Sequence, residues 1–216
     1  MALARVTGPM THGNLSGSMQ HGTWEEIDLY RLFSCLLGFP APDRFSLIAQ
    51  AGFHEAMDGL WTRLGCEGKA PPAIGFASLE QYEACYIALF DVGSPEPPVP
   101  LLESWYHEAI PAQQTVLENV SFYEVIDLRP VASVSAPDHL LTQLEFGAAV
   151  RYLQEGCGSE SERQNLRRLE RDFLERHLLS WIPAALARLE QLGPPIFPVL
   201  FMLLLRFLRT RFDEIQ

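Results

Sequence analysis

Apolar residues recur every three to four positions along most of this chain of 216 residues, which is the spacing that lines one face of an α-helix. The pattern is clear over residues 27–37 and again over residues 160–179. No run of convincing length alternates apolar and polar residues, as a half-buried β-strand would. Because 48% of the residues are hydrophobic, the chain can form a core, and we predict an all-α fold.

Glycine and proline divide this helical pattern into segments. Gly38 and Pro40 end the first helix, and a Pro-Pro pair at 194–195 precedes the last one. Four prolines within residues 91–100 exclude a helix interior and predict a long extended loop. We therefore expect a single domain over residues 23–216, formed by a bundle of about eight helices.

Two sets of residues carry signals for a helix start. Thr23 and Glu26 have the spacing of a capping box, in which each side chain bonds the backbone N–H of the other residue. Ser135 is expected to cap a later helix, with Asp138 in its first turn, where the helix dipole favours a negative charge. The pattern also predicts a helix over residues 101–110.

The ends of the chain and its cysteines favour a cytoplasmic protein. Residues 1–22 are rich in Gly, Ser, Thr, Met and His and lack a continuous apolar run, so we expect a flexible arm and no secretory signal. The longest apolar run, residues 196–205, is too short to span a bilayer, so we expect a buried helix and no stable membrane insertion. The four cysteines form no C-x-x-C pair, which is typical of a reducing compartment.

Acidic residues outnumber basic ones, and the excess is confined to one part of the chain. The net charge is −11, all of it from residues 1–143, because residues 144–216 are neutral overall. Between Lys69 and Arg129 there are nine acids and no Lys or Arg. This argues against nucleic acid as a partner and favours a cationic one, although an acidic face that only aids solubility remains the alternative.

Signals for catalysis and metal binding are weak. The chain has no H-E-x-x-H, no glycine-rich phosphate loop and no G-x-S-x-G. Its six histidines are scattered, so we expect no metal and no cofactor. Asp138 and His139 could face a partner or simply begin a helix, and Trp105 and Tyr106 could line a groove or fill the core.

Four sets of residues in order along the chain resemble one family. The chain is similar to the cytoplasmic maturation chaperones of molybdenum-cofactor oxidoreductases, of the TorD/DmsD/NarJ type. The resemblance covers nearly all of residues 24–212. It is carried by residues 29–40, by 86–90 with the proline-rich loop and 104–106, by 137–140 with Leu144 and Phe146, and by Phe173, His177, Leu178 and Trp181. Residues 91–106 look closest to the branch that includes dimethylsulfide, ethylbenzene, selenate and chlorate enzymes.

The resemblance implies a chaperone without enzymatic activity. Such proteins bind the N-terminal region of an apo catalytic subunit, commonly a twin-arginine signal, until the molybdenum cofactor is inserted, and so delay export. His177 and Trp181 match the family, but their spacing on a helix suggests a structural role. We expect a monomer or weak dimer. The residues that we expect to contact the client are Glu103, Ser104, Trp105, Tyr106, Phe122, Tyr123, Asp127, Pro137, Asp138 and His139.

The sequence departs from the family pattern at one position, and two other functions remain as alternatives. The family commonly has a glycine where this chain has Asp127. A helical adaptor with a different protein client would share the acidic surface. A helical hydrolase using Asp138 and His139 would need a nucleophile or metal that the sequence does not show.

Overall fold

Helices make up most of the computed structural model, which describes residues 3–5, 29–50, 52–67, 76–130, 136–194 and 196–215. The prediction of an all-α fold is confirmed. The α-helices are α1 (Leu29–Leu36), α2 (Pro42–Ile48), α3 (Gly52–Arg63), α4 (Leu79–Tyr86), α5 (Ala112–Glu124), α6 (Leu140–Gly156), α7 (Glu160–Phe173), α8 (Leu179–Leu192) and α9 (Ile196–Glu214). The shorter elements are two π-helical segments, η3 (Ile87–Asp91) and η5 (Leu174–Leu178), a 3₁₀ turn, η4 (Glu103–Tyr106), and two strands, β1 (Leu3–Arg5) and β2 (Leu128–Pro130).

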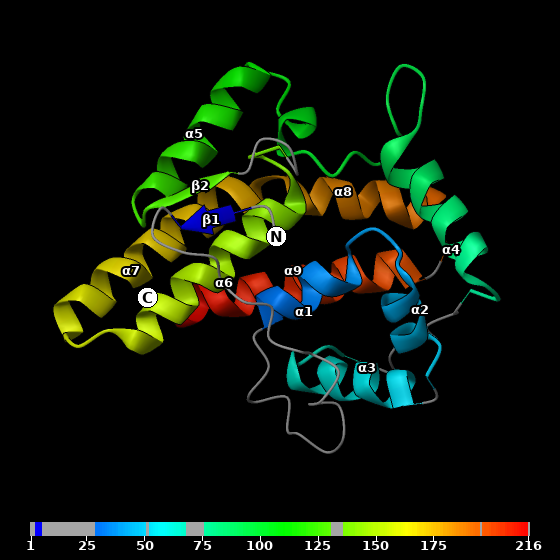
Figure 1. Cartoon of the computed structure of the whole chain (residues 1–216), viewed down its shortest axis with the longest axis horizontal. Helices are drawn as coiled ribbons and strands as arrows, with labels where there is room; N and C mark the ends of the chain where they lie inside the picture. The colour runs from blue at the N-terminus through cyan, green and yellow to red at the C-terminus, as the bar shows by residue number, and fades with distance from the viewer. Residues whose placement is uncertain are drawn as a thin grey trace.

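The last helix forms the centre of the core. In α9, ten residues between Ile196 and Leu208 are buried, because this helix is apolar on nearly every side. Helices α1 and α8 pack against it, and α6 packs against α1 and α7 (Figure 1). The apolar run at 196–205 is therefore the buried helix that the sequence predicts. None of the helices in the described part of the chain is long and apolar enough to cross a membrane.

A buried carboxylate ties four of these helices together. Glu170 of α7 accepts hydrogen bonds from Tyr30 of α1 at 3.0 Å and from Gln154 of α6 at 2.7 Å. Arg211 of α9 donates to both of its oxygens, from Nε at 2.8 Å and from Nη2 at 2.7 Å. Since a buried charge is costly unless it is fully bonded, this geometry fixes the four helices in one arrangement.

In addition to the predicted helices, the structure contains a short two-stranded sheet. Strand β1 pairs with β2 in antiparallel register, with Leu3 opposite Pro130, Ala4 opposite Arg129 and Arg5 opposite Leu128. Residues 3–5 fall in the segment for which we expected a flexible arm. The rest of the expected arm, and the capping box at Thr23 and Glu26, lie outside the described residues.

Two helix boundaries differ from the sequence prediction. The helix expected over 101–110 is only the 3₁₀ turn η4, and α6 begins at Leu140 with His139 as its N-cap. The reason is a backbone pairing, in which the N–H of Glu103 bonds the Asp138 carbonyl at 3.0 Å and the N–H of Leu140 bonds the Leu101 carbonyl at 2.9 Å. These bonds hold both segments extended. Ser135, the expected cap, lies outside the described residues.

The backbone conformation at Asp127 shows why this chain can depart from the family pattern there. It follows the C-terminus of α5 with φ of 54°, in the left-handed region that glycine adopts without strain. Among other residues, Asp and Asn tolerate this region best. Asp127 therefore still provides the turn that leads from α5 into β2.

We predict that Gly147→Ala destabilises the fold. A Cβ at Gly147 in α6 would lie 2.5 Å from Cε1 of Tyr30, whose ring is 1% exposed and whose hydroxyl bonds Glu170. Overpacking should lower the free energy of unfolding by about 1–3 kcal/mol, more than the helix propensity gained. Chemical denaturation measures this change.

Gly156→Ala is the matched control for that variant. It also lies in α6, and its Cβ would meet nothing within 4 Å. We expect equal or slightly higher stability, by up to about 1 kcal/mol. If both variants had the same free energy of unfolding, the close packing of Tyr30 against Gly147 would not contribute to stability.

Candidate functional site

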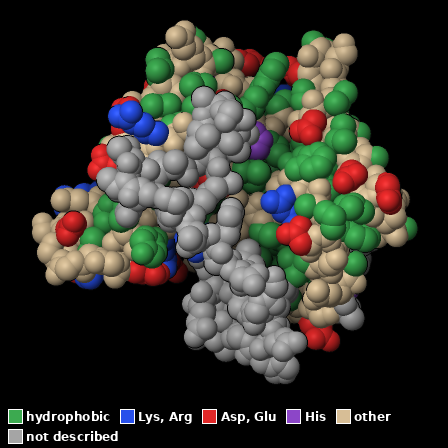
Figure 2. All heavy atoms as spheres, viewed as in Figure 1, with side chains coloured by type: hydrophobic (Ala, Val, Ile, Leu, Met, Phe, Trp, Pro, Cys, Tyr) green, Lys and Arg blue, Asp and Glu red, His purple; other side chains and the backbone are tan. Residues whose placement is uncertain are grey.

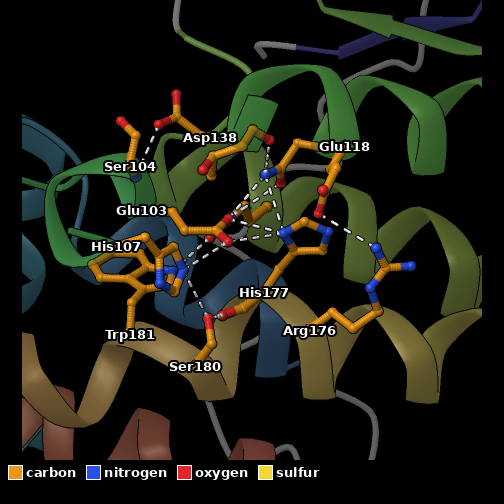
Figure 3. Close-up of polar contacts among 12 residues, drawn as sticks. Glu103, Ser104, His107, Glu118, Asp138, Arg176, His177, Ser180 and Trp181 are labelled. Atoms are coloured by element: carbon orange, nitrogen blue, oxygen red, sulfur yellow. Dashed lines mark hydrogen bonds and ion pairs between the residues drawn. The ribbon is translucent and has the colours of Figure 1, made fainter. Parts of the chain in front are cut away.

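A buried carboxylate lies at the centre of the region that contains the predicted site residues. Glu103 in η4 is 2% exposed, and four other side chains approach its two oxygens (Figure 3). His177 Nδ1 is 2.9 Å from Oε1, His107 Nε2 is 3.2 Å from Oε1, and Asn119 and Gln143 donate to Oε2 at 2.8 and 2.5 Å. We call these five residues the Glu103 cluster.

The Glu103 cluster joins segments that are far apart in the sequence. Asn119 lies on α5, Gln143 on α6 and His177 on η5. Trp181 of α8 extends the network, because its indole N–H donates to Gln143 Oε1 at 3.1 Å. A buried charge with several donors is strongly held, so the cluster fixes the position of η4 against three helical segments.

His177 is buried with its Nδ1 towards Glu103. His177 is 1% exposed, and its ring packs against those of Phe122 and Phe173, at centroid distances of 5.1 and 5.0 Å. Its Nδ1 faces the carboxylate, so this nitrogen carries the hydrogen. Its Nε2 has no hydrogen-bond partner among the described residues. His177 is thus part of the core and of the Glu103 cluster, which agrees with the structural role expected from the sequence.

Asp138 has a different role from the helix-start acid that we expected. Its side chain is 2% exposed, and its Oδ2 accepts the backbone N–H of Ser104 at 3.2 Å. His139 caps α6 instead, because its Nδ1 accepts the N–H of Leu141 at 3.2 Å. Both side chains are thus bonded to backbone groups, and an acid–base pair of the kind that a hydrolase would use is not formed between them.

The predicted aromatic residues form an inner and an outer group. Tyr123 is fully buried and donates its hydroxyl to the Pro137 carbonyl at 2.6 Å. Phe122 is half-buried beside Phe173, at a centroid distance of 5.4 Å. Tyr106 is also half-buried, while Trp105 is 44% exposed, so Trp105 is the most exposed of the four predicted aromatic residues.

Tyr106 is tied to the end of the proline-rich loop and to α8. Its ring lies 5.2 Å from that of Trp181, and the Arg188 guanidinium lies 5.0 Å from its centroid. Its hydroxyl donates to the Pro100 carbonyl at 3.0 Å, and burial raises its pKa well above the ordinary value, so the hydroxyl stays protonated as a donor.

The structure thus brings most of the predicted residues together and separates them by depth. Glu103, Tyr123 and Asp138 are buried, whereas Ser104, Tyr106, Phe122, Pro137 and His139 are half-buried. Trp105 and Asp127 are exposed, on η4 and just after α5 respectively.

Sequence reasoning missed the polar partners of Glu103. Asn119 and Gln143 are fully buried, and His107 is mostly buried. The available signal was polarity at a core-facing helical position, since Gln143 stands between the buried residues Leu140 and Leu144. Among the residues that the structure describes, no group of three or more His, Cys, Asp or Glu is placed to hold a metal ion.

Comparison with known proteins identifies the family. The family model for the nitrate reductase delta subunit matches residues 49–187. A selenate reductase assembly chaperone from Thauera selenatis is 36% identical over 135 residues, which are 61% of this chain and 68% of the relative. A dimethyl sulfide dehydrogenase assembly chaperone from Rhodovulum sulfidophilum is 31% identical over 208 residues, 89% of this chain and 79% of the relative. A chlorate reductase assembly chaperone from Ideonella dechloratans is 35% identical over 133 residues, 60% of this chain and 67% of the relative.

These matches define the class of protein. The chain belongs to the nitrate reductase delta subunit family, the NarJ/TorD type of maturation chaperone. The resemblance found in the sequence is therefore confirmed.

We predict that Glu103→Gln strongly destabilises the fold. The amide would place a donor opposite the donors of His177, Asn119 and Gln143, and it would remove the charge that they stabilise. The free energy of unfolding should fall by about 2–4 kcal/mol. Glu108→Gln, at an exposed position five residues later, should change it by less than about 0.5 kcal/mol. Equal stability of the two variants in denaturant would contradict this role for Glu103.

The capping role of His139 leads to a pH prediction. Burial lowers its pKa from 6.5 to about 4, partly opposed by the Asp138 carboxylate. Because the folded pKa is depressed, the stability that neutral His139 contributes is complete above about pH 6.5 and is lost as the pH falls towards 4. The loss over this window is about 3 kcal/mol, at 1.36 kcal/mol per pKa unit.

His139→Asn tests that dependence, because Asn also caps helices but does not titrate. Unfolding free energies of both proteins would be measured from pH 7 towards pH 4. The wild-type protein should lose about 3 kcal/mol more than the variant. Parallel curves would mean that protonation of His139 does not affect folding.

Proposed function

We propose that this chain is a cytoplasmic maturation chaperone that binds the N-terminal region of the apo catalytic subunit of a molybdenum oxidoreductase. That region is a twin-arginine signal, and its capture delays export until the client's cofactor has been inserted. The chain itself acts by binding, with no catalysis. The observation that carries the proposal is the similarity to three proteins named as assembly chaperones, one of them over 208 residues.

The exposed acids after η4 supply the charge for an arginine pair. Glu108, Glu124 and Asp127 are exposed, whereas Glu103 and Asp138 are buried and bonded within the protein. Arginine binds carboxylates through directional, charge-assisted bonds, which require an accessible carboxylate. The charged part of the client is therefore assigned to the exposed acids.

Exposed apolar side chains lie in the same stretch of the chain. Eight large hydrophobic side chains are exposed in the described part of the chain, and four of them lie between residues 105 and 125. They are Trp105, Ile110, Leu117 and Val125. In the view of Figure 2, hydrophobic and acidic side chains both reach the surface in the upper part of the molecule, where α5 and the segment before it lie. We call these four residues and Glu108, Glu124 and Asp127 the α5 surface.

The α5 surface combines the two chemical features that a signal region requires. Leu117 and Glu124 are seven residues apart on α5, so they point to the same side of the helix. Glu118 is less available, because it forms an ion pair with Arg176 at 3.3 Å. We assign the half-buried residues of the predicted site, among them Ser104, Phe122, Pro137 and His139, to the same client contact. The buried residues Glu103, Tyr123 and Asp138 act by holding their backbone in place.

The test is binding of a synthetic peptide by titration calorimetry. The peptide is the N-terminal Arg-Arg signal region of the catalytic subunit of a molybdenum oxidoreductase. The double variant Glu124→Gln/Asp127→Asn should bind about 3–10-fold more weakly, because each exposed charge pair contributes on the order of 0.2–1 kcal/mol. Wild-type affinity should also fall as salt is raised.

The matched control is Glu55→Gln/Asp58→Asn, which makes the same change of charge on exposed residues of α3. Helix α3 lies at the opposite end of the view in Figure 1 from α5. Its affinity should equal that of the wild-type protein. Equal losses in both variants would point to overall charge and against the α5 surface, and absence of peptide binding would remove the proposed function.

A further inference from the structure

Strand β2 continues directly from the α5 surface and is anchored in the core. It follows Asp127, and its first residue, Leu128, is 1% exposed. Helix α5 packs against β2, and the turn at Asp127 sets the direction in which β2 leaves the helix. The strand is therefore a fixed edge of the domain.

Strand β1, which pairs with this edge, is held less extensively. It is three residues long, its main contacts are with β2 and α6, and residues 6–28 separate it from α1. A two-stranded ladder is at best marginally stable in water without further packing. Backbone pairing also tolerates many sequences, since the hydrogen bonds do not depend on side chains. Another extended segment could thus replace β1 on β2.

The sequence of β1 indicates what kind of segment fits. It reads Leu-Ala-Arg, and its Arg5 is opposite Leu128, the residue next to Asp127. Arg5 is therefore one position along the ladder from Asp127, which is exposed, as is Glu124. A client segment that is extended and contains arginine would have the same backbone and charge requirements.

We infer that the edge of β2 that pairs with β1 is a docking edge for an extended, arginine-containing segment of the client. Residues 3–5 occupy this edge in the free chaperone and are displaced when the client binds. This inference rests on the proposed function and adds to it the backbone that receives the peptide. It also makes residues 3–5 a tethered competitor for the client. The apparent affinity is then the intrinsic affinity multiplied by the fraction of molecules in which the edge is free.

The first test weakens the competitor in the full-length chain. Ala4→Pro removes a backbone N–H from β1 and disfavours its pairing with Arg129. The variant should bind the Arg-Arg peptide about 3–10-fold more tightly than the wild-type protein. Gly13→Pro is the matched control, since it adds a proline outside β1, and it should leave the affinity unchanged.

The second test locks the competitor in place. Positions 4 and 129 are directly opposite in the antiparallel ladder, where Cα separations of about 4.5–5.5 Å suit a disulfide. The variant Ala4→Cys/Arg129→Cys should bind the peptide at least about tenfold more weakly when oxidised than when reduced. Peptide mapping verifies the 4–129 bond against the four native cysteines, and the reduced form is the internal control.

The outcomes separate this inference from the proposed function. Tighter binding by Ala4→Pro together with loss of binding on oxidation supports the docking edge. Equal affinity of the oxidised and reduced forms would overturn it, whatever Ala4→Pro does, while leaving the proposed chaperone role intact. Failure of every form to bind the peptide would reject the proposed function and this inference together.

Discussion

The buried carboxylate of Glu103 is the constraint on which the rest of the candidate site depends. A charge that is 2% exposed is tolerated only because His107, Asn119, Gln143 and His177 all face it. Satisfying it brings η4, α5, α6 and η5 to one point. Surface residues on η4, such as Trp105, take their positions from this inner arrangement.

A second buried carboxylate has the same role at another place in the fold. Glu170 joins α1, α6, α7 and α9 through Tyr30, Gln154 and Arg211. The two acids thus fix the helices by directional bonds as well as by apolar packing, and α6 takes part in both networks. Such clusters favour one helix arrangement, since any other would leave a buried charge without donors.

This architecture separates residues that build the site from those that can meet a partner. Asp138 and His139 are adjacent in the sequence, yet both are bonded to backbone groups, at Ser104 and Leu141. The accessible charge and apolar area lie further out, on the α5 surface. Strand β2 continues that surface and carries its own paired strand. An outer acidic and apolar layer, held by an inner polar one, supports the proposal that this chaperone acts by binding its client.

The sequence by itself determined the helical class, the buried last helix, the acidic segment and the family, because these depend on local periodicity, composition and ordered motifs. Only the tertiary structure decided the conformation of residues 101–110 and the hydrogen-bond partner of Asp138. The backbone of Glu103 pairs with Asp138, 35 residues later, and that bond prevents a helix that the local pattern favours. The pairing of residues 3–5 with 128–130 is likewise set by contacts between distant segments. Local propensity contains no information about such partners, so these features could not be read from the sequence.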